Sequence, residues 1–186
     1  MEKLVRPEKG TRFIGISNFS PTQVRDVVGN ATIKPKVHQF ELHPYLQQQD
    51  WVEENFKYDI TVTGYAPLGN TNPIHNLGVS GSDGNRAPPL LQNAAVTEIA
   101  KARGCSPAQV VLAWNMKRKV AVIPKAAQSV HQKENIVTLD KCKITDDDAK
   151  RISGIKATTE VRLYENICRY GPTVGCSAKA LVGRNP

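Results

Sequence analysis

Short apolar segments alternate along the chain with longer segments whose apolar residues recur at helical spacing. Four of the short segments carry or run into polar residues at or near their carboxyl ends: Phe13–Ile16 before Ser17-Asn18, Val37–Leu42 with Gln39, Ile60–Gly64 before Tyr65, and Val120–Pro124 before Lys125. Strands that are apolar along their length and polar at this end are typical of parallel α/β sheets and barrels. The pattern therefore predicts a ligand site at that edge.

The segments between these strands predict helices. Ser20-Pro21-Thr22-Gln23 and Ser106-Pro107-Ala108-Gln109 each combine a capping serine, a proline at the first helical position and a glutamine that closes a capping box. Further helices are predicted at Met1–Val5, Gln48–Phe56, Leu90–Arg103 with Gly104 as its end, Ser129–Val137 and Thr145–Ile152. Alternating strands and helices predict a parallel sheet with right-handed crossovers. No GxGxxG follows a strand, so a barrel segment is favoured over the usual dinucleotide-binding sheet.

The length of the chain limits how much of a barrel it can form. A complete (β/α)8 barrel takes about 250 residues, and this chain has 186 residues and four predicted strands. We therefore expect residues 1–155 to form about half of a barrel. Residues 70–89 are rich in Gly, Asn, Ser and Pro and predict a long loop, and residues 156–186 form a tail without clear amphipathic period.

Composition and charge limit the kinds of binding partner that we expect and the cellular compartment of the protein. The net charge of +8 suits an anionic ligand, but the basic residues are scattered and lack the interleaved aromatic residues of nucleic-acid-binding domains. The four cysteines form no CxxC pair, which favours reduced thiols and a cytoplasmic protein and predicts no metal site. No apolar run approaches the length of a membrane span, and no leader is recognised. We expect neither a nucleic-acid nor a membrane partner.

The polar residues at the strand ends match the parts of one ligand. Ser17, Asn18 and Gln39 offer neutral donors and acceptors suited to a carboxamide, and Tyr65 offers a flat face for a planar ring. Each of these residues, taken alone, also fits an ordinary loop hydrogen bond or an aromatic residue at the rim of the core.

The region after the fourth strand is suited to the other end of such a ligand. Lys125 and His131 could face a phosphate, and Glu134 and Asn135 could contact a base edge. Lys125 alone also fits a surface lysine. Together with the other strand ends, these residues indicate a site for a nicotinamide dinucleotide.

Five segments resemble the aldo-keto reductases, especially those of fungi: Gly15-Ile16-Ser17-Asn18-Phe19-Ser20, Gln39-Phe40-Glu41-Leu42-His43-Pro44-Tyr45, Gly64-Tyr65-Ala66-Pro67-Leu68-Gly69, Ser106-Pro107-Ala108-Gln109-Val110 and Val122-Ile123-Pro124-Lys125. The match runs from about Met1 to Ile152 in the family's order. By this resemblance, Ser17, Asn18 and Gln39 hold the nicotinamide carboxamide, Tyr65 stacks on the ring, and Leu68 and Asn70 cover the pyrophosphate.

The resemblance assigns the adenosine and 2′-phosphate site to Lys125, His131, Glu134 and Asn135. It implies NADPH as the cofactor. Two departures leave NADH open: Ala126 stands where the family commonly has Ser, and His131 where it commonly has Arg, which provides a bidentate clamp.

The resemblance also implies a (β/α)8 TIM-barrel fold in which this chain is the carboxyl-terminal half, strands 5–8. The family's catalytic Tyr, Asp, Lys and His come from the first half, so no catalytic residue is predicted in this chain. Tyr58-Asp59 precede a strand at the opposite face, and His43-Pro44 after Glu41 fits a structural turn.

Two functions remain open. The first is NAD(P)H-dependent reduction of aldehydes or ketones, with small carbonyl compounds as the substrates of the full-length family and little turnover by this chain alone. The second is a catalytically inactive cofactor-binding or assembly module. A half-barrel exposes two open sheet edges, which predicts self-association.

Overall fold

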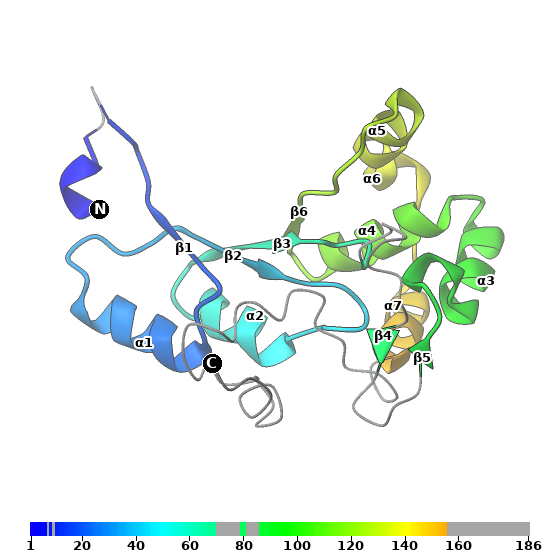
Figure 1. The fold of residues 1–186 in the computed structure, drawn as a ribbon, viewed down its shortest axis with the longest axis horizontal. Coiled ribbons are helices and arrows are strands. Elements are labelled where there is room, and N and C mark those ends of the chain that lie inside the picture. The colour runs from blue at the N-terminus through cyan, green and yellow to red at the C-terminus, as the bar shows by residue number, and fades with distance from the viewer. Residues whose placement is uncertain (7, 9, 70–78, 81–85, 156–186) are drawn as a thin grey trace, which may run out of the picture. The chain divides into compact units, whose positions relative to one another are not determined.

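The computed structural model describes residues 1–6, 8, 10–69, 79–80 and 86–155 (Figure 1). The described residues fall into two compact units, which we call unit 1 (1–40 and 49–62) and unit 2 (41–48 and 63–155). The elements in chain order are η1 (Glu2–Leu4), β1 (Gly15–Ser17), α1 (Pro21–Asn30), β2 (Val37–Glu41), α2 (Gln49–Phe56), β3 (Thr61–Tyr65), β4 (Val79–Ser80), β5 (Arg86–Ala87), η2 (Leu90–Gln92), α3 (Ala94–Arg103), α4 (Pro107–Lys117), β6 (Ala121–Val122), α5 (Ser129–Ile136), α6 (Thr138–Lys141) and α7 (Asp146–Ser153).

Unit 1 packs α1 and α2 against one face of its strands (Figure 1). Strands β1 and β2 run parallel, with Ser17 opposite Gln39 at the end of the ladder. The predicted capping box at the start of α1 is confirmed, because Ser20 and Gln23 each accept a hydrogen bond from the other's backbone N–H. Val24 and Val28 of α1 are buried beside Ile60.

Unit 2 has its apolar core among α3, α4 and α7. Strands β3 and β6 run parallel, with Gly64 opposite Val122. The second predicted capping box, between Ser106 and Gln109, is confirmed at the start of α4. Gly104 ends α3 in the left-handed conformation, at a φ of 63°, as its position predicted. The core cluster consists of Tyr45, Leu90, Val96, Ile99, Ala100, Val110, Val111, Ala113, Trp114, Cys142 and Ile152.

The predicted α/β fold with a parallel sheet is confirmed. Its parallel pairs are β1 with β2 in unit 1 and β3 with β6 in unit 2. The assignment to strands 5–8 of a barrel, the division at residue 155 and self-association through the edges stay predictions. No described helix has the length and apolar character needed to cross a membrane.

Three elements differ from the expected ones. The helix predicted from Leu90 is split, because the Asn93 side chain accepts a hydrogen bond from the Ala95 N–H and so begins α3 anew after η2. The predicted Ser129–Val137 helix is followed directly by α6. Within the segment predicted to be a loop, β4 and β5 form an antiparallel pair, and the rest of that segment and residues 156–186 lie outside the described residues.

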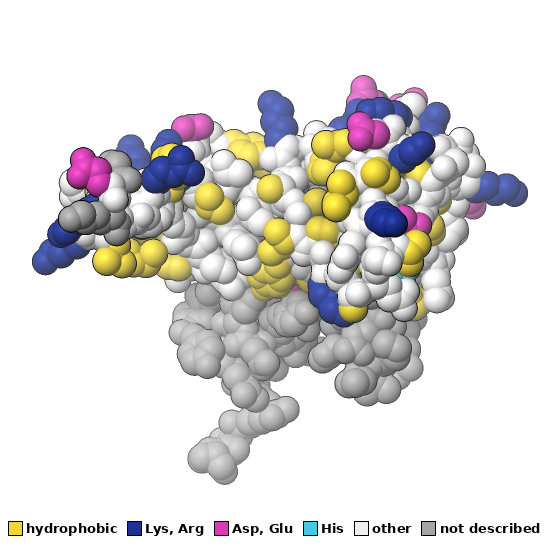
Figure 2. Space-filling view, turned by 90° about the horizontal axis from the view of Figure 1, so that it is seen from above, with side chains coloured by type: hydrophobic (Ala, Val, Ile, Leu, Met, Phe, Trp, Pro, Cys, Tyr) yellow, Lys and Arg dark blue, Asp and Glu magenta, His cyan; other side chains and the backbone are white. Residues whose placement is uncertain are grey.

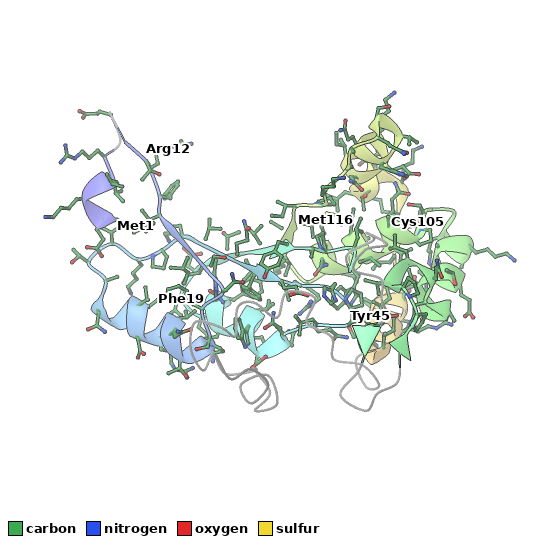
Figure 3. All side chains as sticks on the ribbon, in the orientation of Figure 1. Met1, Arg12, Phe19, Tyr45, Cys105 and Met116 are labelled. Carbon is green, nitrogen blue, oxygen red and sulfur yellow. A yellow bond between two sulfur atoms is a disulfide. The ribbon has the colours of Figure 1, made fainter. Side chains whose placement is uncertain are left out.

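The prediction of reduced cysteines is wrong for two of the four. Cys105 and Cys142 form a disulfide, with Cα atoms 5.5 Å apart (Cys105 is labelled in Figure 3). The two residues are 37 positions apart in the chain. The packing of α4 against α5 and α6 brings the ends of these segments together, and sequence spacing carries no sign of this.

Surface charge is mixed on the face shown in Figure 2, where Lys and Arg side chains are interspersed with acidic and hydrophobic ones. Several ion pairs in the described residues combine the two signs, including Lys36 with Asp59 and Lys117 with Asp146, both at 2.8 Å. Part of the positive charge in the described residues is therefore paired with neighbouring carboxylates.

Candidate functional site

Three of the predicted site residues lie together in unit 1. Ser17, the last residue of β1, is the register partner of Gln39 in β2, and register partners in a sheet point to the same face. The Asn18 backbone N–H donates to the Gln39 carbonyl oxygen at 3.0 Å. Asn18 has a φ of 59°, a left-handed conformation that asparagine tolerates better than most residues. The structure therefore brings Ser17 and Asn18, at the carboxyl end of β1, beside Gln39 in the middle of β2.

A buried chain of hydrogen bonds in unit 1 begins at Phe19, the residue that follows Asn18. The Phe19 backbone N–H donates to His38 Nε2 at 3.1 Å, and His38 Nδ1 lies 2.9 Å from Asn55 Oδ1. Asn55 Nδ2 in turn donates to the Trp51 carbonyl oxygen at 2.8 Å. Because Nε2 accepts a backbone N–H, the imidazole proton belongs on Nδ1, which donates to Asn55.

Burial lowers the pKa of His38 to about 4, against a smaller opposing effect of its hydrogen bond to Asn55. The imidazole is therefore neutral at physiological pH. Sequence analysis did not single out His38 or Asn55. The available signal was a polar residue at a position of β2 that alternation places on the buried face, between the outward positions of Val37 and Gln39.

Tyr65 and Leu68 lie at the end of β3 in unit 2. The Tyr65 carbonyl oxygen accepts the Leu42 N–H at 3.2 Å, which aligns the end of β3 with the segment after β2. The chain then turns, with the Gly69 N–H donating to the Ala66 carbonyl oxygen at 3.0 Å. Leu68 packs against the core of unit 2. Tyr65 is thus placed at the strand end as predicted, and Leu68 is fixed in the turn that follows.

Asn70 lies outside the described residues, and the other predicted residues lie after β6 and on α5. Lys125 is exposed in the segment between them. On α5, His131 Nδ1 lies 3.3 Å from Glu134 Oε2. Asn135 lines an open hollow of about 520 Å3 with Met116, Val122, Pro124, Ala126, Gln132 and Ile136. The Glu134 carbonyl oxygen accepts hydrogen bonds from Gln109 Nε2 and Thr138 Oγ1, which ties α5 to α4 and α6.

His43 has the structural role that the sequence predicted. Its backbone exchanges hydrogen bonds with that of Leu46, which forms the turn after β2. Its Nε2 lies 2.8 Å from Glu41 Oε1, and both side chains are fully buried. This polar pair therefore stabilises the turn rather than facing the strand-end edge.

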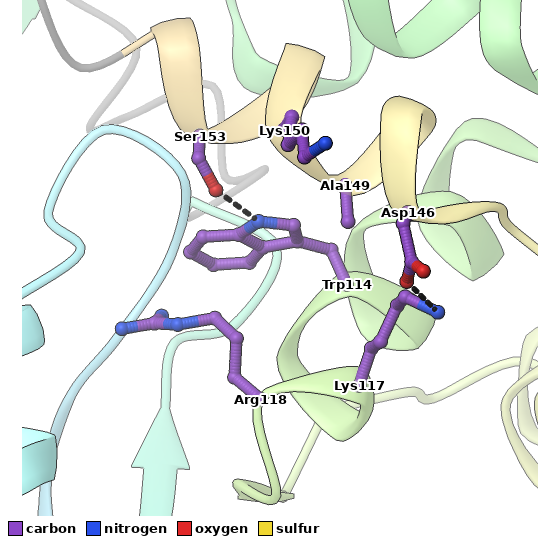
Figure 4. Close-up of a pocket in the computed structure, with 7 residues that line it drawn as sticks. All are labelled: Trp114, Lys117, Arg118, Asp146, Ala149, Lys150 and Ser153. Atoms are coloured by element: carbon purple, nitrogen blue, oxygen red, sulfur yellow. Dashed lines mark hydrogen bonds and ion pairs between the residues drawn. The ribbon is translucent and has the colours of Figure 1, made fainter.

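A second open hollow, of about 510 Å3, lies between α4 and α7 in unit 2 (Figure 4). It is lined by Trp114, Lys117, Arg118, Asp146, Ala149, Lys150 and Ser153. Lys117 pairs with Asp146 at 2.8 Å, Lys150 lies 3.5 Å from Asp147, and the guanidinium of Arg118 lies 4.3 Å from the centre of the Trp114 ring. Among the described residues, no group of His, Cys, Asp and Glu side chains is arranged to hold a metal ion.

The site residues fit a nicotinamide cofactor by the chemistry of the groups that each unit brings together. Ser17, Asn18 and Gln39 carry donor and acceptor groups of the kind that a carboxamide requires, at the end of β1 and on the neighbouring β2. Lys125 and His131 supply cationic or donor groups near a hollow lined by the Asn135 amide.

The model of the protein family "Aldo/keto reductase family" matches residues 1–157 of the chain. A probable NAD(P)H-dependent D-xylose reductase of Aspergillus niger is 39% identical over 155 residues, which cover 83% of this chain and 47% of that protein. The chain spans about half the length of the curated relatives it matches.

Solved structures agree with the sequence relatives. The aldose reductase of Giardia lamblia matches with a TM-score of 0.72 at 30% identity, over 87% of this chain and 50% of that one. A silkworm aldo-keto reductase solved in complex with NADPH matches with a TM-score of 0.72 at 25% identity, over 87% and 46% of the two chains.

Proposed function

Because the chain belongs to the aldo/keto reductase family, we propose that it binds NADPH and serves in the reduction of aldehydes or ketones to alcohols. The observation that carries the proposal is the Ser17–Gln39 register with Asn18 beside it, because these three side chains would be the partners of the carboxamide. The bound cofactor would supply a hydride to the carbonyl carbon of a small substrate. The likeness to a reductase solved with NADPH supports the choice of cofactor.

Each unit contributes its own binding groups to this proposal. In unit 1, the Gln39 and Asn18 amides and the Ser17 hydroxyl would orient the nicotinamide carboxamide and thereby select one face of the ring. In unit 2, the Tyr65 ring would stack on the nicotinamide, and Leu68 would cover the pyrophosphate. Lys125 and His131 would face the 2′-phosphate, and Glu134 and Asn135 the adenine edge. An imidazole lacks the fork of a guanidinium, so NADH is the alternative cofactor.

Cofactor binding is tested by titrating the chain with NADPH while following the fluorescence of Trp51 and Trp114. We expect saturable quenching, and we expect Gln39→Ala to weaken NADPH binding about tenfold, because it removes carboxamide hydrogen bonds of about 1 to 1.5 kcal/mol in total. Gln49→Ala, an exposed glutamine on α2, is the matched control and keeps the wild-type affinity.

Two results would contradict these expectations separately. A wild-type chain without NADPH or NADH binding overturns the proposed function. Equal affinities for Gln39→Ala and the wild type, with intact binding, overturn the role of Gln39 alone.

The alternative function is a cofactor-binding or assembly module without catalysis. It is favoured by the hydrogen bonds that the hydroxyl groups of the described tyrosines make. Carbonyl reduction needs an acid that protonates the substrate oxygen. The Tyr45 hydroxyl donates to the Pro88 carbonyl oxygen at 2.8 Å and accepts from Asn93, and burial raises the pKa of Tyr45. The Tyr58 hydroxyl donates to Glu54, and Tyr65 is proposed to stack on the ring. These roles leave the described tyrosines unsuited to proton donation.

We therefore expect the 186-residue chain alone to bind NADPH without turning it over. With an aldose or an aromatic aldehyde present, the loss of NADPH absorbance should match that of a sample without protein. A rate proportional to the concentration of the purified chain would refute this expectation and favour the enzymatic function for the chain by itself.

A further inference from the structure

The link between β1 and α1 is held by three consecutive backbone N–H groups. Asn18 donates to the Gln39 carbonyl oxygen at 3.0 Å, and Phe19 donates to His38 Nε2 at 3.1 Å. Ser20 donates to Gln23 Oε1 at 2.8 Å, within the capping box of α1. The Phe19 contact is the one in which a distant side chain fixes the link. It acts on the residue directly after Asn18, whose left-handed conformation must be maintained against its intrinsic cost.

The imidazole of His38 is itself held rigidly. It is fully buried, and its Nδ1 is tied through Asn55 to the backbone of Trp51 in α2. Aromatic rings surround it, with the centroid of Phe40 at 4.6 Å and that of Phe19 at 6.4 Å. A ring fixed on both nitrogens and enclosed by aromatic neighbours cannot change its rotamer without breaking several contacts.

The direction of the two hydrogen bonds fits only one tautomer and protonation state of the His38 imidazole. A neutral imidazole with its proton on Nδ1 donates to Asn55 and accepts from Phe19. A protonated ring would place an N–H against the Phe19 N–H, and the other tautomer would lose both bonds. The groups that contact the ring, Phe19, Phe40, Trp51 and Asn55, carry no charge.

We propose that His38 is a positioning residue for cofactor binding: by accepting the Phe19 N–H, its imidazole holds the Ser17-Asn18 backbone in the conformation that binds the nicotinamide carboxamide. His38 does not contact the cofactor in this proposal. The inference rests on the proposed function and extends it to a residue behind the site. A rigid support of this kind raises affinity because the carboxamide partners need no ordering on binding.

The test compares two fragments of the cofactor, reduced nicotinamide mononucleotide and 2′,5′-ADP, by calorimetric or fluorescence titration. In His38→Phe, which keeps a buried ring and removes the acceptor, we expect about tenfold weaker binding of the mononucleotide. Binding of 2′,5′-ADP should stay unchanged. In His38→Gln, whose side-chain oxygen can accept the Phe19 N–H, we expect mononucleotide affinity to return to within about threefold of the wild type.

A second measurement uses the wild-type chain and does not depend on the folding of any variant. Nitrogen-15 NMR of the histidine rings should show the His38 imidazole with Nδ1 protonated and Nε2 unprotonated. The opposite tautomer at His38 would overturn the proposal.

The outcomes separate this inference from the function on which it rests. Wild-type protein that binds neither fragment overturns the proposed function and this inference with it. If the wild type binds the mononucleotide and His38→Phe binds it with the same affinity, the role of His38 alone is overturned. An equal loss of affinity for both fragments in His38→Phe also overturns it, because that result indicates general unfolding.

Discussion

We expect Trp114→Ala to lower the free energy of unfolding by about 3 to 5 kcal/mol, the usual cost of removing a large aromatic side chain from a core. Trp114 is fully buried on α4. Its Nε1–H donates to Ser153 Oγ of α7 at 3.0 Å, and the guanidinium of Arg118 lies 4.3 Å from its ring centre (Figure 4). Alanine would leave a cavity between α4 and α7 and remove both polar contacts.

Urea unfolding followed by circular dichroism measures this loss without depending on tryptophan fluorescence. Ser153→Ala removes only the hydrogen-bond acceptor and should cost about 1 kcal/mol. Trp114→Phe keeps most of the apolar volume and should fall between the two. A loss below about 1 kcal/mol for Trp114→Ala would contradict the packing described for unit 2.

The second large effect is acid destabilisation through His38. Its pKa is 6.5 in the unfolded chain and about 4 in the folded protein, so the unfolded state takes up the proton first. The contribution of His38 to stability is therefore complete above about pH 6.5 and is lost as the pH falls toward 4. Between pH 7.5 and 4 the free energy of unfolding should fall by about 3 kcal/mol from this group.

The pH range over which His38 lowers the free energy of unfolding differs from the range over which the carboxylates do so. The hydrogen bond from Lys57 lowers the pKa of Glu54, and the hydrogen bond from Arg103 lowers that of Asp148. Their contributions are present above the ordinary carboxyl pKa and are lost only as the pH falls below it. These two carboxylates therefore contribute little to unfolding curves from pH 7.5 to 5, and His38→Gln should flatten those curves. An equal slope in the variant and the wild type would contradict the depressed pKa.

Local elements could be predicted because their signals lie within a few residues. The capping boxes at Ser20 and Ser106 involve a serine and a glutamine three positions apart, and both formed as predicted. Ser17 and Gln39 could be singled out because each is a polar residue in or directly after a short apolar segment, and parallel register brought them together. Each of these features depends on backbone geometry within one element or on its nearest neighbour in the sheet.

The features missed by sequence analysis join residues that are far apart. His38 contacts Phe19 and Asn55, 19 and 17 positions away. The bond between Cys105 and Cys142 spans 37 positions, and Trp114 and Ser153 are 39 apart. In sequence, His38 was a polar residue in an apolar strand, and the cysteines were unpaired. Nothing in the local pattern indicated which partner each would meet.

The sequence by itself thus determined the alternation of strands and helices, their caps, and the polar residues at the strand ends that make a cofactor site chemically plausible. The tertiary structure decided which buried polar groups support that site, above all the neutral imidazole of His38 behind Asn18. The physical reason is burial. A polar group removed from water must find a partner wherever packing places one, and the packing of distant segments is not encoded in any short stretch of sequence.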